Sequence, residues 1–75
     1  MYTAKLTVID VLKGTILDEH KITGAKTARL AHDVALELYN NIKHTYKPCT
    51  DAEISVYADG YYIDEERYLD NPDCD

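Results

Sequence analysis

The chain has 75 residues, of which 45% are hydrophobic, and its formal net charge is −6. This length suits one domain with a small core, which we expect over residues 1–69, followed by an acidic tail over 70–75. No apolar run is long enough to cross a bilayer, and the net charge disfavours direct binding to nucleic acid or to an anionic membrane. Because no signal peptide is recognisable, the expected compartment is the cytoplasm.

Charge is divided unevenly along the chain. Residues 1–48 carry seven basic and five acidic side chains, whereas residues 49–75 carry nine acidic side chains and a single basic one. The second part therefore repels nucleic acid and attracts basic protein surfaces, with association rates that fall as the salt concentration rises.

The first third of the chain has the pattern of a strand hairpin. Residues 2–9 alternate between apolar and polar side chains, which predicts a strand with one buried face. A turn at Lys13-Gly14 leads into a second extended segment, residues 15–23. The buried face of the first strand is expected to hold Tyr2, Ala4, Leu6 and Val8. One side of the second strand is expected to hold Ile16, His20 and Ile22.

The middle of the chain changes to a helical pattern. From Ala25 to about His44, apolar residues recur at three- and four-residue steps, which predicts an amphipathic helix of about five turns. Thr23 or Thr27 is suited to cap its start, and Pro48 prevents its continuation. Its apolar side is expected to hold Ala28, Ala31, Val34, Ala35, Leu38 and Ile42.

A second hairpin is predicted around Asp59-Gly60, a dipeptide that favours a type I′ turn because both central residues adopt positive φ. Such a two-residue loop sets the register of the flanking strands and places Tyr57 opposite Tyr62. The side beneath the helix is expected to hold Ala52, Ile54, Val56, Ala58, Tyr61 and Ile63. The outward side is expected to hold Glu53, Ser55, Tyr57, Tyr62, Asp64 and Glu66.

The order strand, strand, helix, strand, strand predicts a two-layer α+β fold. We expect a four-stranded, mostly antiparallel sheet with one helix packed on one face. This ββαββ order resembles the topology of the small immunoglobulin-binding domains of the β-grasp family, which implies that the first and last strands lie side by side in the middle.

Residues that commonly act in catalysis or metal binding occur without a recognisable arrangement. His32 and His44 are separated by more than three helical turns, so they cannot share one ion, and His20 lies on a strand. The acidic segments 59–66 and 70–75 lack the spaced ligands of a calcium loop. We therefore expect no enzyme, no metal and no cofactor, and a small enzyme or metal protein is the least favoured alternative.

The two cysteines, Cys49 and Cys74, are far apart in the sequence. They have no local pattern of a disulfide framework, and the chain has no secretion signal. We therefore expect two free thiols.

The outward side of the second hairpin is the candidate partner-binding surface: Glu53, Tyr57, Tyr62, Asp64 and Glu66. The predicted register places Glu53 opposite Glu66, a like-charge pair that destabilises a hairpin by a few tenths of a kcal/mol. Carboxylates two residues apart on a strand are about 6.6–6.8 Å apart, similar to the spacing of phosphates along nucleic acid, so this side could imitate nucleic acid and occupy an Arg/Lys groove. The simpler interpretation is a solvated strand protected by charge.

The stretch SVYADGYYIDEERYLDNPDCD, residues 55–75, resembles in charge and surface type the small anti-defence proteins of phages and mobile elements. These include anti-CRISPR inhibitors and DNA-mimic anti-restriction proteins. The resemblance implies a non-enzymatic inhibitor in the cytoplasm of a bacterial host, which blocks a basic nucleic-acid-binding surface of a host complex. The alternative is a structural or homo-oligomeric module without mimicry, whose sheet edge pairs with another chain, as in a homodimer.

Overall fold

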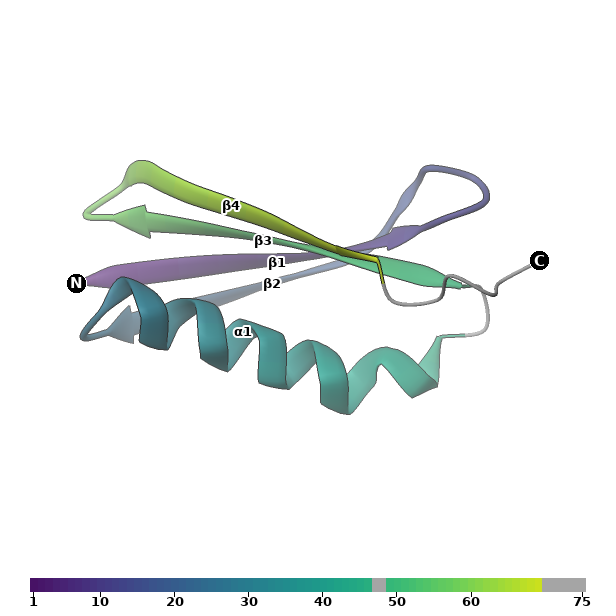
Figure 1. The fold of residues 1–75 in the computed structure, drawn as a ribbon, viewed down its shortest axis with the longest axis horizontal. Coiled ribbons are helices and arrows are strands. Elements are labelled where there is room, and N and C mark those ends of the chain that lie inside the picture. Colours follow the sequence, from purple (N-terminus) through teal and green to yellow (C-terminus); the bar gives the residue numbers. More distant parts are fainter. Residues whose placement is uncertain (47–48, 70–75) are drawn as a thin grey trace.

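The alternating segments form four strands, and the segment with helical spacing forms the helix between the second and third of them (Figure 1). The computed structural model describes residues 1–46 and 49–69, and the expected tail over 70–75 lies outside these ranges. The strands are β1 (Tyr2–Asp10), β2 (Ile16–Ala25), β3 (Thr50–Ala58) and β4 (Tyr61–Leu69). The helix α1 (Ala28–Ile42) continues into one 3₁₀ turn, Lys43–Thr45.

The helix lies across one face of a single sheet with the strand order β2-β1-β3-β4, and every neighbouring pair is antiparallel. The two-layer α+β prediction is confirmed, but the β-grasp arrangement is wrong, because β3 and not β4 lies beside β1. The composition of β4 explains this order. Its core-side positions include Asp64 and Glu66, and carboxylates are costly in the centre of a sheet that a helix covers. The helix instead crosses over β1 to join β2 and β3, which run parallel to each other.

The core lies between α1 and the two central strands. Its fully or nearly fully buried members are Ala4, Leu6, Val8, Ala25, Ala31, Ala35, Tyr39, Ala52, Ile54 and Val56. Tyr39 is the largest of the fully buried side chains, and its hydroxyl contacts Thr50 Oγ1 at 2.9 Å and donates to the Thr50 carbonyl at 3.2 Å. The prediction that Val34 faces the core is wrong, since it is 38% exposed. The helix turns the stripe Ala31, Ala35, Tyr39 inward instead, and the small alanines let it lie close to the sheet.

The helix begins later than expected. Gly24 has a φ of +78°, and β2 continues to Ala25. Thr27 is the N-cap, because its Oγ1 accepts a hydrogen bond from the Leu30 amide at 3.0 Å. Among the described residues, no helix has the length and apolar character needed to cross a membrane.

The first hairpin turns at Gly14, as predicted, with a φ of +69°. Asp10 stabilises the turn, because its Oδ1 accepts hydrogen bonds from the amides of Leu12 and Lys13 at 3.0 and 3.1 Å. The expected position of Ile16 beside His20 is wrong. The register shifts between Val8 and Ile9, and Ile16 is 59% exposed.

The second hairpin contains a β-bulge that the turn dipeptide does not reveal. Asp59 and Gly60 have φ values of +50° and +89°, so the predicted turn is confirmed, and so is the pair Tyr57–Tyr62. Beyond this pair, Val56 lies opposite Asp64 and not opposite Ile63, which is the extra residue of the bulge. Each later pair is shifted by one: Ser55 opposite Glu65, Ile54 opposite Glu66, Glu53 opposite Arg67. The like-charge pair predicted between Glu53 and Glu66 therefore does not exist.

Cys49 lies immediately before β3 and is disulfide-bonded, so the expectation of a free thiol is wrong for this residue. The expectation for Cys74 lies outside the described residues. Asp51 pairs with Leu69, so the end of β4 lies beside the start of β3, which Cys49 precedes in the chain.

Candidate protein-binding surfaces on the second hairpin

The bulge divides the five predicted contact residues between two sides of the sheet. Glu53, Tyr57 and Tyr62 lie on the face that α1 leaves uncovered, which we call the open face. Asp64 and Glu66 lie opposite Val56 and Ile54, on the side that packs against α1. A one-residue shift exchanges the two sides of a strand, so the structure does not bring all five together.

Asp64 and Glu66 line a groove between the helix and the edge strand. This α1–β4 groove has a volume of about 400 Å³, and the residues that line it are Ala28, Arg29, His32, Asp33, Val56, Asp64 and Glu66. His32 Nε2 lies 3.1 Å from Glu66 Oε2, and its Nδ1 lies 3.1 Å from Asp33 Oδ1. Arg29 Nε lies 3.6 Å from Asp33 Oδ2, one helical turn away. The basic side chains of the groove therefore already face acidic neighbours.

The groove retains an excess of negative charge. Three carboxylates line it, whereas Arg29 is its single permanent cation. No described basic side chain lies within ion-pair distance of Asp64, whose Oδ1 accepts only the Glu65 amide, at 2.9 Å. Burial, with a hydrogen bond to Glu66, raises the pKa of Tyr68, beside the groove, to about 12. Asp64 is the carboxylate most available to a partner's cation.

The open face is less negative than the sequence suggested. Tyr57 and Tyr62 pack edge to face, with ring centroids 5.9 Å apart, and the Tyr62 hydroxyl donates to Glu65 Oε2 at 3.1 Å. A hydrogen bond to Glu65, together with burial, raises the pKa of Glu53, and the same bond lowers the pKa of Glu65. The two carboxyl groups thus hold a proton between them to higher pH than isolated groups would. Arg67 is paired with Asp51, Nη2 to Oδ2, at 3.0 Å.

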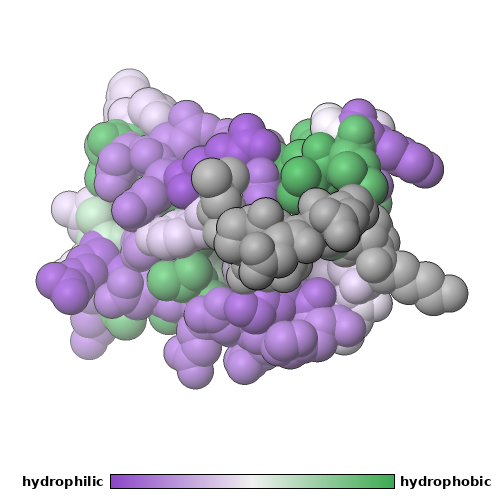
Figure 2. Space-filling view, turned by 45° about the vertical axis from the view of Figure 1, so that its right-hand side comes forward, coloured by the Kyte–Doolittle hydropathy of each residue, from purple (hydrophilic) through white to green (hydrophobic). Residues whose placement is uncertain are grey.

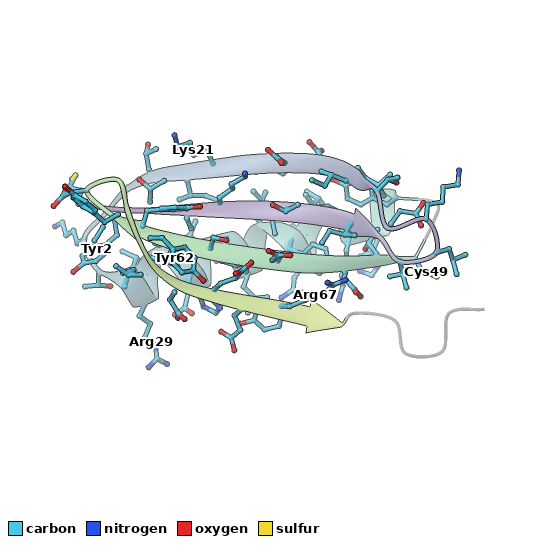
Figure 3. The ribbon with its side chains drawn as sticks, turned by 90° about the horizontal axis from the view of Figure 1, so that it is seen from above. Tyr2, Lys21, Arg29, Cys49, Tyr62 and Arg67 are labelled. Carbon is cyan, nitrogen blue, oxygen red and sulfur yellow. The ribbon has the colours of Figure 1, made fainter. Side chains whose placement is uncertain are left out.

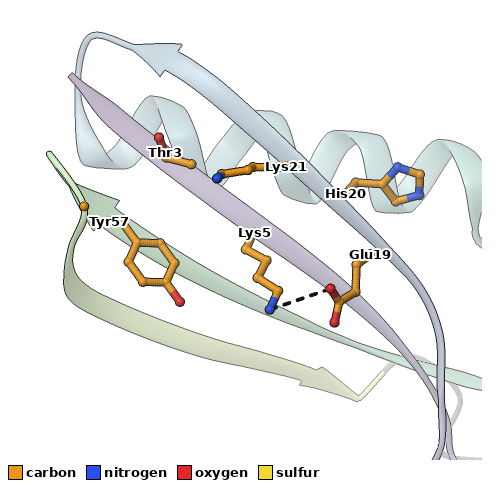
Figure 4. Close-up of a pocket in the computed structure, with 7 residues that line it drawn as sticks. Thr3, Lys5, Glu19, His20, Lys21 and Tyr57 are labelled. Carbon is orange, nitrogen blue, oxygen red and sulfur yellow. Dashed lines mark ion pairs between the residues drawn. The ribbon is translucent and has the colours of Figure 1, made fainter.

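The other half of the open face carries lysines. Lys5 on β1 lies directly opposite Lys21 on β2, and Figure 3 shows Lys21 and Tyr62 on opposite sides of the open face. A hollow of about 530 Å³ extends from this half to Tyr57 and Gly60 of the second hairpin (Figure 4). Its lining includes Thr3, Lys5, Glu19, Lys21 and Tyr57, and Lys5 Nζ lies 3.7 Å from Glu19 Oε2. The sequence alone did not indicate this cationic site, because the site depends on the register of the first hairpin, which places Lys5 opposite Lys21.

An apolar patch covers the turn between β1 and β2. Val11, Leu12, Ile16 and Leu17 are all exposed there, and Figure 2 shows hydrophobic surface gathered at this end of the molecule. The sequence signal was the run of apolar residues on both sides of Lys13-Gly14. An exposed apolar patch of this kind is typical of interaction sites, but the patch contains no group that specifies a partner.

Among the described residues, no group of three or more His, Cys, Asp or Glu side chains is arranged to hold a metal ion. The three histidines lie apart from one another as expected: His20 on β2, His32 on α1 and His44 in the 3₁₀ turn. Comparisons with protein-family models, with curated proteins and with solved structures found no match for this chain.

Proposed function

We propose that this chain is a non-enzymatic binding protein that inserts its β4 edge into a basic, nucleic-acid-binding surface of another protein and so blocks that surface. The observation that supports this proposal is the placement of Asp64 and Glu66. The bulge turns both into the α1–β4 groove, where the existing basic side chains are already paired.

The chemistry of the groove fits a guanidinium or ammonium group. A partner's arginine can form two parallel hydrogen bonds with a carboxylate, and Asp64 has no described cation to release first. A groove of about 400 Å³ accommodates side chains rather than a whole helix. Tyr61, at the hairpin tip and 78% exposed, adds an amphipathic anchor beside the carboxylates.

The open-face residues of the expected site have a different place in this proposal. Glu53, Tyr57 and Tyr62 lie on the open face, on the opposite side of the sheet from the groove. These residues contact the partner only if the cleft of the partner protein encloses both sides of β4. The proposed target remains a host complex that handles nucleic acid, and an anti-defence inhibitor of the phage type is the form of this function that we would test first.

The test begins with capture of bound proteins from a bacterial lysate containing defence complexes. The affinity of a captured, purified nucleic-acid-binding protein is then measured for the parent chain, Asp64→Lys and Glu37→Lys. The two variants change net charge equally, but Glu37 lies exposed on α1, outside the groove. We expect Asp64→Lys to weaken binding at least about tenfold and to reduce its salt dependence, whereas Glu37→Lys changes affinity by less than about twofold.

Equal losses in the two variants would mean that net charge alone causes binding and that the groove has no special part. Unchanged affinity in Asp64→Lys would overturn the placement of the site. Capture of no protein that binds nucleic acid would overturn the proposed class of partner.

A further inference from the structure

The strand registers arrange the open-face charges in two rows across the sheet. One row runs Lys21, Lys5, Ser55, Glu65 from β2 to β4, and the next row runs Glu19, Thr7, Glu53, Arg67. In each row, the side chain at the β2 edge has a charge opposite to that of the side chain at the β4 edge. If a second copy of the face is laid over the first with its β2 edge above the β4 edge, the edge charges that meet therefore have opposite signs.

Within one chain, the cationic half of the first row is electrostatically unfavourable. Lys5 and Lys21 are directly opposite each other, which is unfavourable for like charges on neighbouring strands. Glu19 pairs with Lys5, but Lys21 has no ion pair with any described residue. At the other edge, Glu65 faces the same side of the sheet, and its described contacts are with Tyr62 and Glu53 and not with a basic side chain.

We infer that the open face binds a second copy of this chain, face to face, about a two-fold axis that runs along the strands. Such an axis places each β2 edge over the β4 edge of the other copy. Lys21 of one copy then meets Glu65 of the second copy, and Glu19 meets Arg67 of the second copy. Because the axis is two-fold, each contact occurs twice.

The shape of the face agrees with this pairing. The hollow is lined mainly by residues of β1 and β2, among them Lys5 and Lys21, and it extends to Tyr57 on β3. Tyr62, which is 56% exposed, lies on the β4 half of the same face (Figure 3). Exchange of the two edges brings Tyr62 of one copy over the hollow of the other. The Tyr62 hydroxyl donates a hydrogen bond to Glu65, so the aromatic ring and the carboxylate of one copy approach the lysines of the other copy together.

The size of the face predicts a weak dimer. Strands of nine residues at about 3.3 Å per residue, with four strands about 4.8 Å apart, give a face of about 600 Å² per copy. The total of about 1,200 Å² is at the lower limit for specific interfaces, and the pairing is partly electrostatic. We expect a reversible dimer in the micromolar range that dissociates as salt is added. The alternative that the sequence left open was a homodimer paired through a sheet edge, whereas the pairing inferred here uses the open face.

The test is sedimentation equilibrium of the purified chain at low and high salt, using Lys21→Glu and Glu65→Lys separately, mixed, and combined in one chain. Each single variant places like charges across both copies of the contact, so we expect self-association to weaken at least about tenfold. A mixture of the two single variants restores opposite charges at both contacts, as does the combined variant. Both should regain dimerisation to within about threefold of the parent, while circular dichroism confirms an unchanged fold.

A parent chain that stays monomeric to millimolar concentration would overturn this inference. The inference would be overturned in the same way if the chain stays monomeric because the hollow binds a small anion. A dimer unaffected by the charge reversals would also overturn it and would indicate edge pairing. The experiment contains no other protein, so its failure is distinct from failure of the proposed partner binding, which is probed at Asp64 on the other side of the sheet.

Discussion

His32 on α1 lies with its Nε2 atom 3.1 Å from Oε2 of Glu66 on β4, and this contact joins the helix to an edge strand. The Tyr68 hydroxyl also reaches the same imidazole nitrogen. The contact depends on the bulge, because a regular register would turn Glu66 to the open face. The bulge in β4 therefore makes possible a contact between the helix and the edge strand across the α1–β4 groove.

Replacing Glu66 by alanine should lower the free energy of unfolding by about 0.5–1 kcal/mol, because a partly exposed charged hydrogen bond is lost. Glu66→Gln keeps an acceptor at this position and should lose less. Urea unfolding measures both changes, and the NMR signals of the His32 ring report the contact directly. If both variants match the parent in stability and in the His32 signals, this contact does not join α1 to β4.

Tyr39→Phe should lower the free energy of unfolding by about 1 kcal/mol, because the buried hydroxyl has its hydrogen bonds with Thr50 and the ring still fills the core. The urea midpoint should fall while the denaturant slope stays constant. Tyr61→Phe is the matched control, since Tyr61 is exposed, and it should leave the midpoint unchanged. An equal effect of both substitutions would show that the Thr50 contacts are not the cause.

Glu53→Gln should change how stability depends on pH. The folded-state pKa of Glu53 is raised above its usual 4.5, so its contribution is fully present below pH 4.5 and is lost as pH rises through the folded value. The glutamine amide can donate to Glu65 without titrating. Thermal unfolding from pH 4 to pH 8 should therefore show the variant gaining stability relative to the parent as pH rises. A difference that is constant with pH would contradict the shared proton.

The local elements follow from short stretches of the sequence alone. The two-residue period of Ala4, Leu6 and Val8 predicts a strand with one buried side, and this side is buried because exposure of its apolar groups to water is unfavourable. Asp59-Gly60 predicts its turn because a positive φ is least costly at these residue types. These features depend on a few neighbouring residues, so they can be read before the fold is known.

Tertiary packing sets the strand order and the rotation of the helix about its axis. It also sets the side of the sheet on which Asp64 and Glu66 lie. Burial of Tyr39 and exposure of Val34 reflect which helical stripe meets the sheet, a choice that helical spacing leaves open. The bulge at Ile63 lets Tyr68 lie opposite Ala52 and pack against the core. Because one extra residue exchanges the two sides of a strand, a single long-range packing preference separated the candidate contact residues between two surfaces.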